Sequence, residues 1–329
     1  MKIGKRLLLI LLTILFSTTI TFFVIRLMPG DPVENMAISI HAGMGVSWEE
    51  AVEQAKARLN YDPDIPMIRQ YTNYLWQIFR GDMGESIIRR APVSQIIAEV
   101  LPWTLLISSF ALLLAFLIGT VLGLYCSWKR NTWLNKLVTA YDSIVGSMPA
   151  FIIGFLLIIV FSVKLGWLPM RGNYESGLTP GWNGAYIASV AKHAVLPILT
   201  WVLTSVGGWA LGMRALGVSV LGEDYIVSAR ARGLKQRRII SSYVGKNAIL
   251  PQFTQLAVAF GSMFAGSVLV ENTFNYPGMG YFFSSAISGR DYPLMQGMFL
   301  ILTIAVVIAN QAAELLYSVI DPRIRKGGK

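Results

Sequence analysis

Residues 102–126 read PWTLLISSFALLLAFLIGTVLGLYC, a run of 25 residues without a charged side chain. About 20 apolar residues in a helix cross the hydrocarbon core of a bilayer, so this run is long enough to span a membrane. The composition agrees, because 54% of the 329 residues are hydrophobic and only 14% are charged. A soluble domain is nearer one quarter charged. The sequence therefore predicts an integral membrane protein.

Apolar stretches of similar length occur elsewhere in the chain. They cover residues 7–27, 137–163, 196–216, 250–270 and 294–319. We therefore expect an all-α integral membrane fold with six transmembrane helices. Basic residues before the first stretch are also typical of a signal peptide. That stretch is too long for a typical signal sequence and no A-x-A-like cleavage site follows it, so we expect a retained membrane anchor.

The distribution of Lys and Arg predicts the orientation of the chain. With the N-terminus inside, 17 of the 28 basic residues fall in cytoplasmic segments, and the two short outer loops hold only four. The long outer segment, residues 28–101, carries ten of the 18 acidic residues. We therefore expect both termini to lie in the cytoplasm.

Prolines and glycines mark the expected spans. Pro149 lies inside the third span and should kink it. Pro102, Pro197 and Pro251 are expected near helix starts, where a missing N–H costs least. Small residues four apart, such as Gly119 and Gly123, should let the second span pack closely against another helix.

The long outer segment should form a small lobe. Ser47, with Glu50 three residues later, is a capping box that predicts a helix start. Residues 62–66 end this helix, and residues 67–79 predict a second one. The lobe could pack over the spans or offer a docking surface for an external partner, and the sequence leaves these two hypotheses even.

Sequence motifs for catalysis or nucleotide binding are absent. The chain has two histidines, His41 and His193, and no H-E-x-x-H, G-x-S-x-G or P-loop pattern. One cysteine, Cys126, excludes an intramolecular disulfide and a cysteine-based metal cluster. The net charge of +10 could suggest nucleic acid, but such a basic face belongs on a polar, water-soluble surface. We expect no catalytic residue, no metal site and no nucleic-acid partner.

Polar side chains at membrane depth are candidate translocation-path residues by default. Gln252, Gln255 and Ser262 lie in the fifth span, and Asn310 and Glu314 lie near one face of the sixth. A water-filled route between helices would explain them. Hydrogen bonding between helices is the alternative.

The most basic segment is EDYIVSARARGLKQRR, residues 223–238. Its acidic start favours the positive end of a helix, and Ile226, Ala229 and Gly233 recur at helical spacing. We expect a short helix, a break at Gly233, and a second helix leading to Pro251. From the residues alone, this segment could equally be a lipid-contacting basic patch that sets the topology.

The text of this segment resembles a known signature. It is similar to the cytoplasmic signature of binding-protein-dependent ABC transporter permeases, through DYIVSARARGL at 224–234 followed by KNAILP at 246–251. More narrowly, it resembles the B-type subunit of dipeptide, oligopeptide and nickel importers. The resemblance covers nearly the whole chain. Further motifs occur in the family's order: MPGDP (28–32), RGDMGES (80–86), SMPAF (147–151), ENTFNYPGMG (271–280), RDYPLMQG (290–297) and DPRIR (321–325).

The resemblance implies the fold of a type I ABC importer permease. Residues 1–27 would form the cytoplasmic N-terminus and first helix, residues 28–101 the extracytoplasmic lobe, residues 102–319 the five-helix core and residues 320–329 a cytoplasmic tail. Within the core, residues 222–249 would form the coupling loop, which fits a groove on an ATPase subunit. The implied coupling residues are Asp224, Tyr225, Ser228, Ala229, Arg230, Ala231, Arg232, Gly233 and Leu234. Ala229, Ala231 and Gly233 would permit close approach, and the two arginines could pair with acids of the ATPase.

This chain departs from the family pattern at three places. Val227-Ser228-Ala229 stands where the superfamily often has Glu-Ala-Ala. Tyr243-Val244-Gly245 replaces the usual His-Ala-Leu, and Glu314 stands where Asp is usual. The departure at 243–245 affects the expected fine contacts of the second helix of the loop.

The resemblance also implies partners and a role. The chain would be a non-catalytic permease in a bacterial or archaeal cytoplasmic membrane, surrounded by lipid. Its partners would be a second similar permease, two ATP-binding subunits that use ATP and Mg, and an external solute-binding protein. No cofactor would bind this chain. Peptides are the leading substrate, with oligosaccharides or chelated nickel as alternatives, and an ATP-independent channel or secondary carrier is the alternative from another class.

Overall fold

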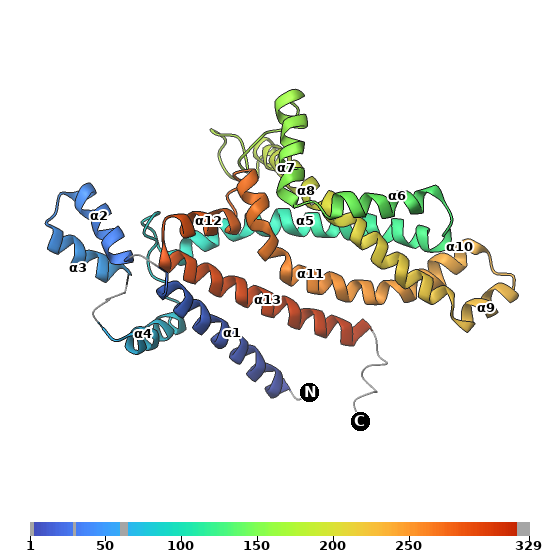
Figure 1. Ribbon diagram of the computed structural model, residues 1–329, viewed down its shortest axis with the longest axis horizontal. Helices are drawn as coiled ribbons and strands as arrows, with labels where there is room; N and C mark the ends of the chain where they lie inside the picture. The colour runs from blue at the N-terminus through green and yellow to red at the C-terminus, as the bar shows by residue number, and fades with distance from the viewer. Residues whose placement is uncertain (1–2, 29–30, 60–64, 321–329) are drawn as a thin grey trace. The chain divides into compact units, whose positions relative to one another are not determined.

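The computed structural model describes residues 3–28, 31–59 and 65–320 (Figure 1). Over these ranges the chain is helical, apart from turns, loops and one isolated bridge between Glu85 and Pro92. The predicted all-α fold is thus confirmed. The DPRIR motif lies outside the described residues. The chain forms two compact units, and each is described by itself.

Unit 1 combines residues 1–104 with residues 277–307. Its helices are α1 (Ile3–Arg26), α2 (Pro32–Met44), α3 (Trp48–Leu59), α4 (Met67–Phe79), the first part of α5 (Val93–Trp128), α12 (Met279–Ser288) and the first part of α13 (Tyr292–Ile320). One apolar cluster joins helices far apart in the sequence, with Ile25 of α1, Val100 of α5, Met279 of α12 and Met298 of α13 all buried. The two ends of the chain's sequence therefore share one core in this unit.

Unit 2 combines residues 105–276 with residues 308–329. It holds the rest of α5, α6 (Trp133–Tyr141), α7 (Ala150–Leu157), α8 (Gly184–Leu221), α9 (Asp224–Ala231), α10 (Gln236–Arg238), α11 (Lys246–Thr273) and the π-helical turns η1 (Asp142–Gly146), η2 (Ile158–Lys164) and η3 (Ile239–Gly245).

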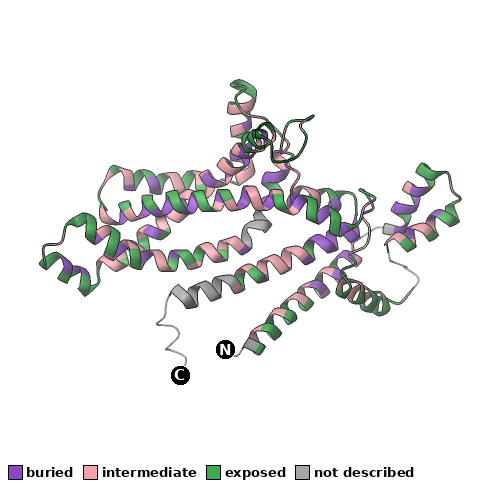
Figure 2. Ribbon diagram, turned by 180° about the vertical axis from the view of Figure 1, so that it is seen from behind, coloured by how far each residue is buried: buried purple, intermediate pink, exposed green. Residues whose placement is uncertain are grey.

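Glycines let α5 pack closely against α8. A Cβ atom on Gly119 would overlap the Cβ of Trp209, and one on Gly123 would overlap the carbonyl oxygen of Ala210. The predicted close packing at these glycines is confirmed. Figure 2 shows the result as buried positions that alternate with exposed ones along the long helices.

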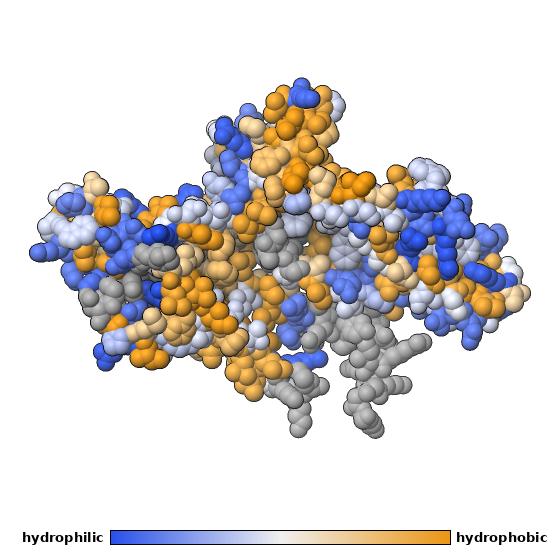
Figure 3. Space-filling view, viewed as in Figure 1, coloured by the Kyte–Doolittle hydropathy of each residue, from blue (hydrophilic) through white to orange (hydrophobic). Residues whose placement is uncertain are grey.

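Four helical stretches are long and apolar enough to cross a membrane: Arg6–Arg26, Val93–Trp128, Gly184–Leu221 and Tyr292–Gln311. A bent pair, Trp133–Gly146 with Ala150–Lys164, would make a fifth. The remaining predicted span falls in α11, where the side chains of residues 262–266 are outside the described part. Figure 3 shows hydrophobic residues over the surface of the bent pair around α7, as expected for a lipid-facing helix.

The predicted kink at Pro149 is confirmed, because the two helices of the bent pair meet at 96° beside this proline. The prediction for the other prolines was wrong. Pro102, Pro197 and Pro251 lie inside α5, α8 and α11 rather than at their starts. Proline removes only one helical hydrogen bond, and packing on both sides can carry a helix through that loss.

Helix α8 also begins twelve residues before the predicted span, at Gly184. The side chain of Asn183 caps it by accepting a hydrogen bond from the Tyr186 N–H at 2.8 Å. The first turns of α8 are too polar to be recognised by an apolar-length criterion.

The outer segment contains the two predicted helices and one that was missed. The Glu50 N–H donates to Ser47 Oγ at 3.2 Å, which confirms the cap of α3, and α4 has the predicted bounds. The missed helix, α2, packs against α3 through a small apolar cluster. Its start was marked in the sequence, since Asp31 accepts a hydrogen bond from the Val33 N–H at 2.8 Å and Pro32 occupies the first helical position.

Candidate functional site

The basic segment forms a helix, a break and a second helical stretch, as the spacing predicts. Helix α9 ends at Ala231, and Gly233 takes the left-handed conformation with φ +68°. The Leu234 N–H donates back to the Ala229 carbonyl at 3.3 Å, which closes the helix end. A non-glycine residue at 233 would be strained by this φ angle, whereas space beside it is open. Gly233 therefore fixes the sharp break.

One face of α9 is fixed to the rest of unit 2. Ile226 and Ala229 are buried in a cluster with Ile239 and Val244 of η3. Trp128 and Leu221, at the ends of α5 and α8, are partly buried against the same cluster. Helix α9 is thus held on a rigid apolar support at the end of two long helices, where Figure 1 shows it.

The opposite face of α9 is exposed. Seven of the nine implied coupling residues are exposed: Asp224, Tyr225, Ser228, Arg230, Ala231, Arg232 and Gly233. Val227, one of the departures from the family pattern, is 61% exposed. An exposed valine and tyrosine beside arginines is a surface of mixed character that suits contact with another protein.

Burial changes the expected role of two coupling residues. Ala229 is only 3% exposed and lies in the chain's own apolar cluster, and Leu234 is partly buried against that cluster. The expectation that Ala229 permits close approach of a partner therefore fails, because its side chain is covered from within. Ala231 and Gly233 are the small residues that remain accessible.

Two of the five candidate path residues meet at a cavity of about 690 Å³ between α8 and α11. Gln252 and Gln255 line it together with Ser205, Gly208 and Trp209. Gln252 is 2% exposed, and its Nε2 donates to the Trp209 carbonyl at 2.9 Å, so it joins the two helices. Gln255 is exposed on the cavity wall and is the freer of the two.

Asn310 is the one other candidate path residue whose side chain the structure describes, and it does not line this cavity. It is exposed on α13. Ser262 and Glu314 lie in α11 and α13, and their side chains fall outside the described part of the structure.

Asp142 is a candidate that the sequence reasoning missed. It lies within the bent pair, in the π-helical turn η1, and its carboxylate packs against Gly207 of α8 and Gly146. A Cβ atom on Gly208, which lines the cavity, would be 3.9 Å from Asp142 Oδ1. An acidic residue inside a predicted span was the available signal.

A buried carboxylate joins two of the quoted motifs in unit 1. Asp291 of RDYPLMQG is fully buried and accepts hydrogen bonds from Ser86 Oγ of RGDMGES at 2.5 Å and from the Ile88 N–H at 3.1 Å. Its other oxygen accepts from the Leu294 N–H at 3.2 Å at the start of α13. Burial raises the pKa of Asp291 above its ordinary value of 3.8, and these hydrogen bonds act in the opposite direction.

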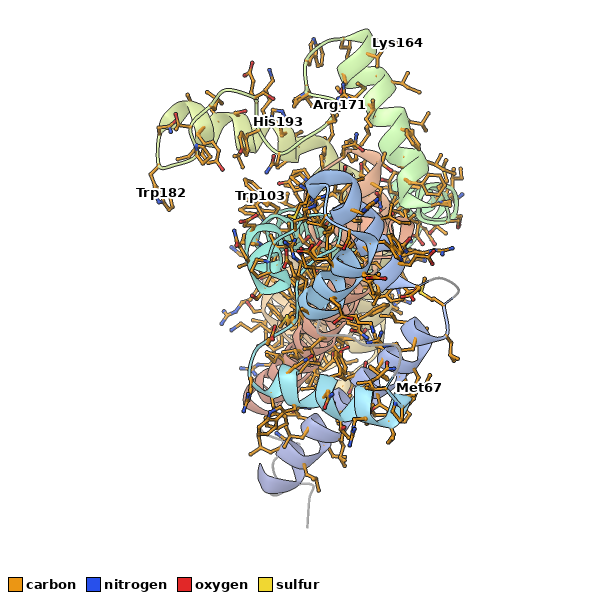
Figure 4. All side chains as sticks on the ribbon, turned by 90° about the vertical axis from the view of Figure 1, so that its left-hand side faces the viewer. Met67, Trp103, Lys164, Arg171, Trp182 and His193 are labelled. Carbon is orange, nitrogen blue, oxygen red and sulfur yellow. The ribbon has the colours of Figure 1, made fainter. Side chains whose placement is uncertain are left out.

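The loop between η2 and α8 presents exposed aromatic surface. Trp182 is completely exposed, and Figure 4 shows it projecting from this loop, away from the labelled His193 and Arg171. His193 is held within its helix, because its Nδ1 lies 2.8 Å from the Ser189 carbonyl oxygen. Among the described residues, no group of three or more His, Cys, Asp or Glu side chains could hold a metal ion.

Comparison with known proteins identifies the family. A family model for the binding-protein-dependent transport system inner membrane component matches residues 119–326. A di/tripeptide transport system permease of Pseudomonas aeruginosa (strain UCBPP-PA14) is 33% identical over 98% of each chain. A probable D,D-dipeptide transport system permease of Escherichia coli (strain K12) is 35% identical over 94% of this chain and 93% of its own, and a glutathione transport system permease of Salmonella typhimurium (strain LT2) is 32% identical over 98% and 97%. The chain therefore belongs to the family of binding-protein-dependent transport system inner membrane components.

Proposed function

We propose that this chain is a permease subunit of an ATP-driven importer of di- or oligopeptides. It forms half of the translocation pathway with a second, similar permease. Two ATP-binding subunits dock in the cytoplasm and use ATP and Mg, and an external solute-binding protein delivers the substrate. This chain supplies no catalytic group, because transport needs only a pore whose two ends open alternately.

The observation that carries this proposal is the construction of α9. One side is anchored by Ile226 and Ala229, the other side is exposed, and Gly233 breaks the chain sharply after it. An anchored helix transmits a push from a partner to the helices that support it, whereas a mobile loop would absorb it. Helix α8 provides the direct route to the cavity, because its end packs against the same cluster and its earlier turns line the cavity.

Peptides are favoured as the substrate for two reasons. The named relatives are permeases for di/tripeptides, D,D-dipeptides and glutathione. The cavity also presents the amide of Gln255 and the hydroxyl of Ser205 between apolar side chains. Such a wall can exchange hydrogen bonds with a peptide backbone and still accept varied side chains.

The orientation and the external partner belong to the same proposal. The distribution of the basic residues favours a cytoplasmic location for both termini. The outer lobe and the outer loop around Asp291 would then face the solute-binding protein. Trp182, on another predicted outer loop, is a second candidate contact, since exposed tryptophan is enriched in interfaces.

Uptake of a labelled dipeptide tests this function. Cells that lack their own peptide importers should take up the dipeptide when they express the chain with its partner subunits. Gly233→Trp should abolish that uptake and uncouple ATPase stimulation from substrate, whereas Gln236→Trp, at an exposed position beyond the break, should retain it. Uptake that continues after ATP depletion would indicate a channel or secondary carrier. Competition by an oligosaccharide or chelated nickel, but not by unlabelled dipeptide, would contradict peptide as the substrate.

A further inference from the structure

A second feature of the basic segment is a small cavity of about 320 Å³. Four residues line it: Trp128 at the end of α5, Arg130 in the turn after α5, Leu221 at the end of α8 and Arg230 on α9. Two guanidinium groups therefore meet at one hollow, although they are 100 residues apart in the sequence. Figure 3 shows hydrophilic residues gathered over this end of unit 2.

The side chain of Arg230 and the backbone turn that carries Arg130 are held before any ligand arrives. The Cζ atom of Arg230 lies 5.5 Å from the centre of the Trp128 ring, a cation–π contact that orients the guanidinium. On the other side, the Thr132 hydroxyl donates to the Lys129 carbonyl at 3.0 Å and the Asn135 amide donates to the Arg130 carbonyl at 2.5 Å, which fixes the turn that carries Arg130. Trp128 and Leu221 rest on the buried apolar cluster beneath α9, so the floor of the cavity is rigid as well.

The charge of the cavity is not balanced by the chain. No acidic residue lines it, and no ion pair links Arg130 or Arg230 to an acid among the described residues. Two adjacent guanidinium groups repel each other unless an anion lies between them. Arginine forks match the oxygen geometry of phosphate, so a phosphate group is the anion that this pair suits best.

The location of the cavity indicates where that phosphate comes from. Two membrane-crossing stretches, Val93–Trp128 and Gly184–Leu221, both end at residues that line it. Tyr125 and Trp133, on either side of the α5–α6 turn, are exposed, and Lys129 Nζ lies 5.7 Å from the Tyr125 ring. Exposed aromatic and basic side chains at the ends of spanning helices mark the headgroup level of a bilayer. We propose that the cavity between Arg130 and Arg230 binds a phosphate group, and that this phosphate belongs to an anionic phospholipid of the surrounding membrane.

This site divides the basic segment between two roles. Arg230 takes part in the lipid site, whereas Arg232 lies outside the cavity lining and stays on the exposed end of α9. The two hypotheses that the sequence left open, a lipid patch and a partner surface, therefore apply to different residues of one helix. A bound lipid would also tie α9 to the ends of α5 and α8 from the outside.

The test uses the full chain, purified from membranes with the subunits that accompany it, and native mass spectrometry of bound lipid. Phosphatidylglycerol is titrated against wild type, Arg130→Gln, Arg230→Gln and the double variant. One basic residue near an anionic surface contributes a factor of about five in affinity, so the double variant should bind about thirtyfold more weakly. Arg237→Gln with Arg238→Gln is the matched control, because these exposed arginines do not line the cavity, and its affinity should stay within about twofold. Replacing both cavity arginines by lysine should restore part of the binding, which separates lost charge from misfolding.

The source of the phosphate is tested in the same experiment. Phosphatidylcholine, which carries a phosphate but no net charge, should bind more weakly than phosphatidylglycerol, and millimolar inorganic phosphate should not displace the lipid. Displacement by inorganic phosphate would assign the site to a soluble anion and overturn the lipid proposal. Unchanged lipid binding by the double variant would overturn it too. Loss of the ATP-binding subunits with unchanged lipid binding would assign the two arginines to that partner instead.

Discussion

Asp291 offers the sharpest test of how unit 1 is held together, because one buried carboxylate accepts hydrogen bonds from the distant segment 86–88 and from the nearby Leu294 N–H. Asp291→Asn keeps the shape of the side chain but replaces one oxygen by an NH₂ group. If Oδ1 is the atom replaced, Ser86 and Ile88 keep their acceptor and the Leu294 N–H loses its own. Asp291→Ala removes both acceptor oxygens, so Ser86 Oγ, the Ile88 N–H and the Leu294 N–H all lose their acceptor.

These geometries set the expected losses of stability. One buried donor left without a partner costs about 1–3 kcal/mol, so Asp291→Asn should lower the free energy of unfolding by about that amount. Asp291→Ala should cost about 3–5 kcal/mol, less than three full penalties because the surroundings relax. Ser86→Ala removes one donor to the carboxylate and should cost about 1.5–3 kcal/mol, the range for hydrogen bonds to charged groups.

A double-mutant cycle isolates the contact between the two motifs. The free energy of unfolding is measured by SDS titration of the full chain in mixed micelles, followed by tryptophan fluorescence, for wild type, Ser86→Ala, Asp291→Ala and the double variant. Directly bonded residues should show a coupling energy of about 1–2 kcal/mol. Ser284→Ala, a substitution at a partly exposed serine elsewhere in unit 1, serves as the control and should show no coupling with Asp291→Ala. A coupling below about 0.5 kcal/mol between Ser86 and Asp291 would refute this account of the contact.

Further predictions concern pH, helix packing and the path. The pKa of Asp291 is raised in the folded chain, so the stability that this group contributes is complete below its ordinary pKa of 3.8 and is lost as pH rises through the raised pKa. The loss in free energy of unfolding caused by Asp291→Asn should therefore be larger at pH 4 than at pH 8. An equal loss at both pH values would contradict the burial argument. Gly123→Val should lower the free energy of unfolding by about 1–3 kcal/mol, and with it the SDS midpoint, since α5 and α8 cannot both keep their positions. An unchanged midpoint would show that the two helices are not in contact at this residue. Asp142→Asn should reduce dipeptide uptake at least tenfold with unchanged amounts of chain in the membrane, as measured by immunoblot, if its carboxylate serves the path; wild-type uptake would leave it a packing residue.

The membrane character of the fold was predictable because apolar length is a local property of the sequence. The kink at Pro149 and the cap at Ser47 were predictable for the same reason, since each depends on residues within one or two turns. The start of α8 was not, because Gly184 to Val195 is too polar to be recognised as part of a span and its helical state depends on the Asn183 cap. The three prolines inside helices show the same limit, because packing by distant residues decides whether a helix survives proline.

The candidate site was predictable as a segment but not as a surface. The spacing in residues 223–238 predicts a helix and a break, yet it cannot tell that Ala229 faces inward, since burial of Ala229 depends on Ile239 and Val244 from η3. The contact of Ser86 with Asp291 and the meeting of Arg130 with Arg230 are each made across long stretches of chain. Single-sequence periodicity carries no information about such pairs.

Site-specific photo-cross-linking from the exposed face of α9 tests the central claim most directly. A photoreactive amino acid is placed at Val227, which is 61% exposed, and in a separate variant at Ile68 of α4, which is 67% exposed. The account predicts that illumination of whole cells joins the Val227 variant to an ATP-binding subunit, while the Ile68 variant yields no such product. A cross-link to the ATP-binding subunit from Ile68 and none from Val227 would contradict the claim that α9 is the surface through which ATP hydrolysis drives this permease.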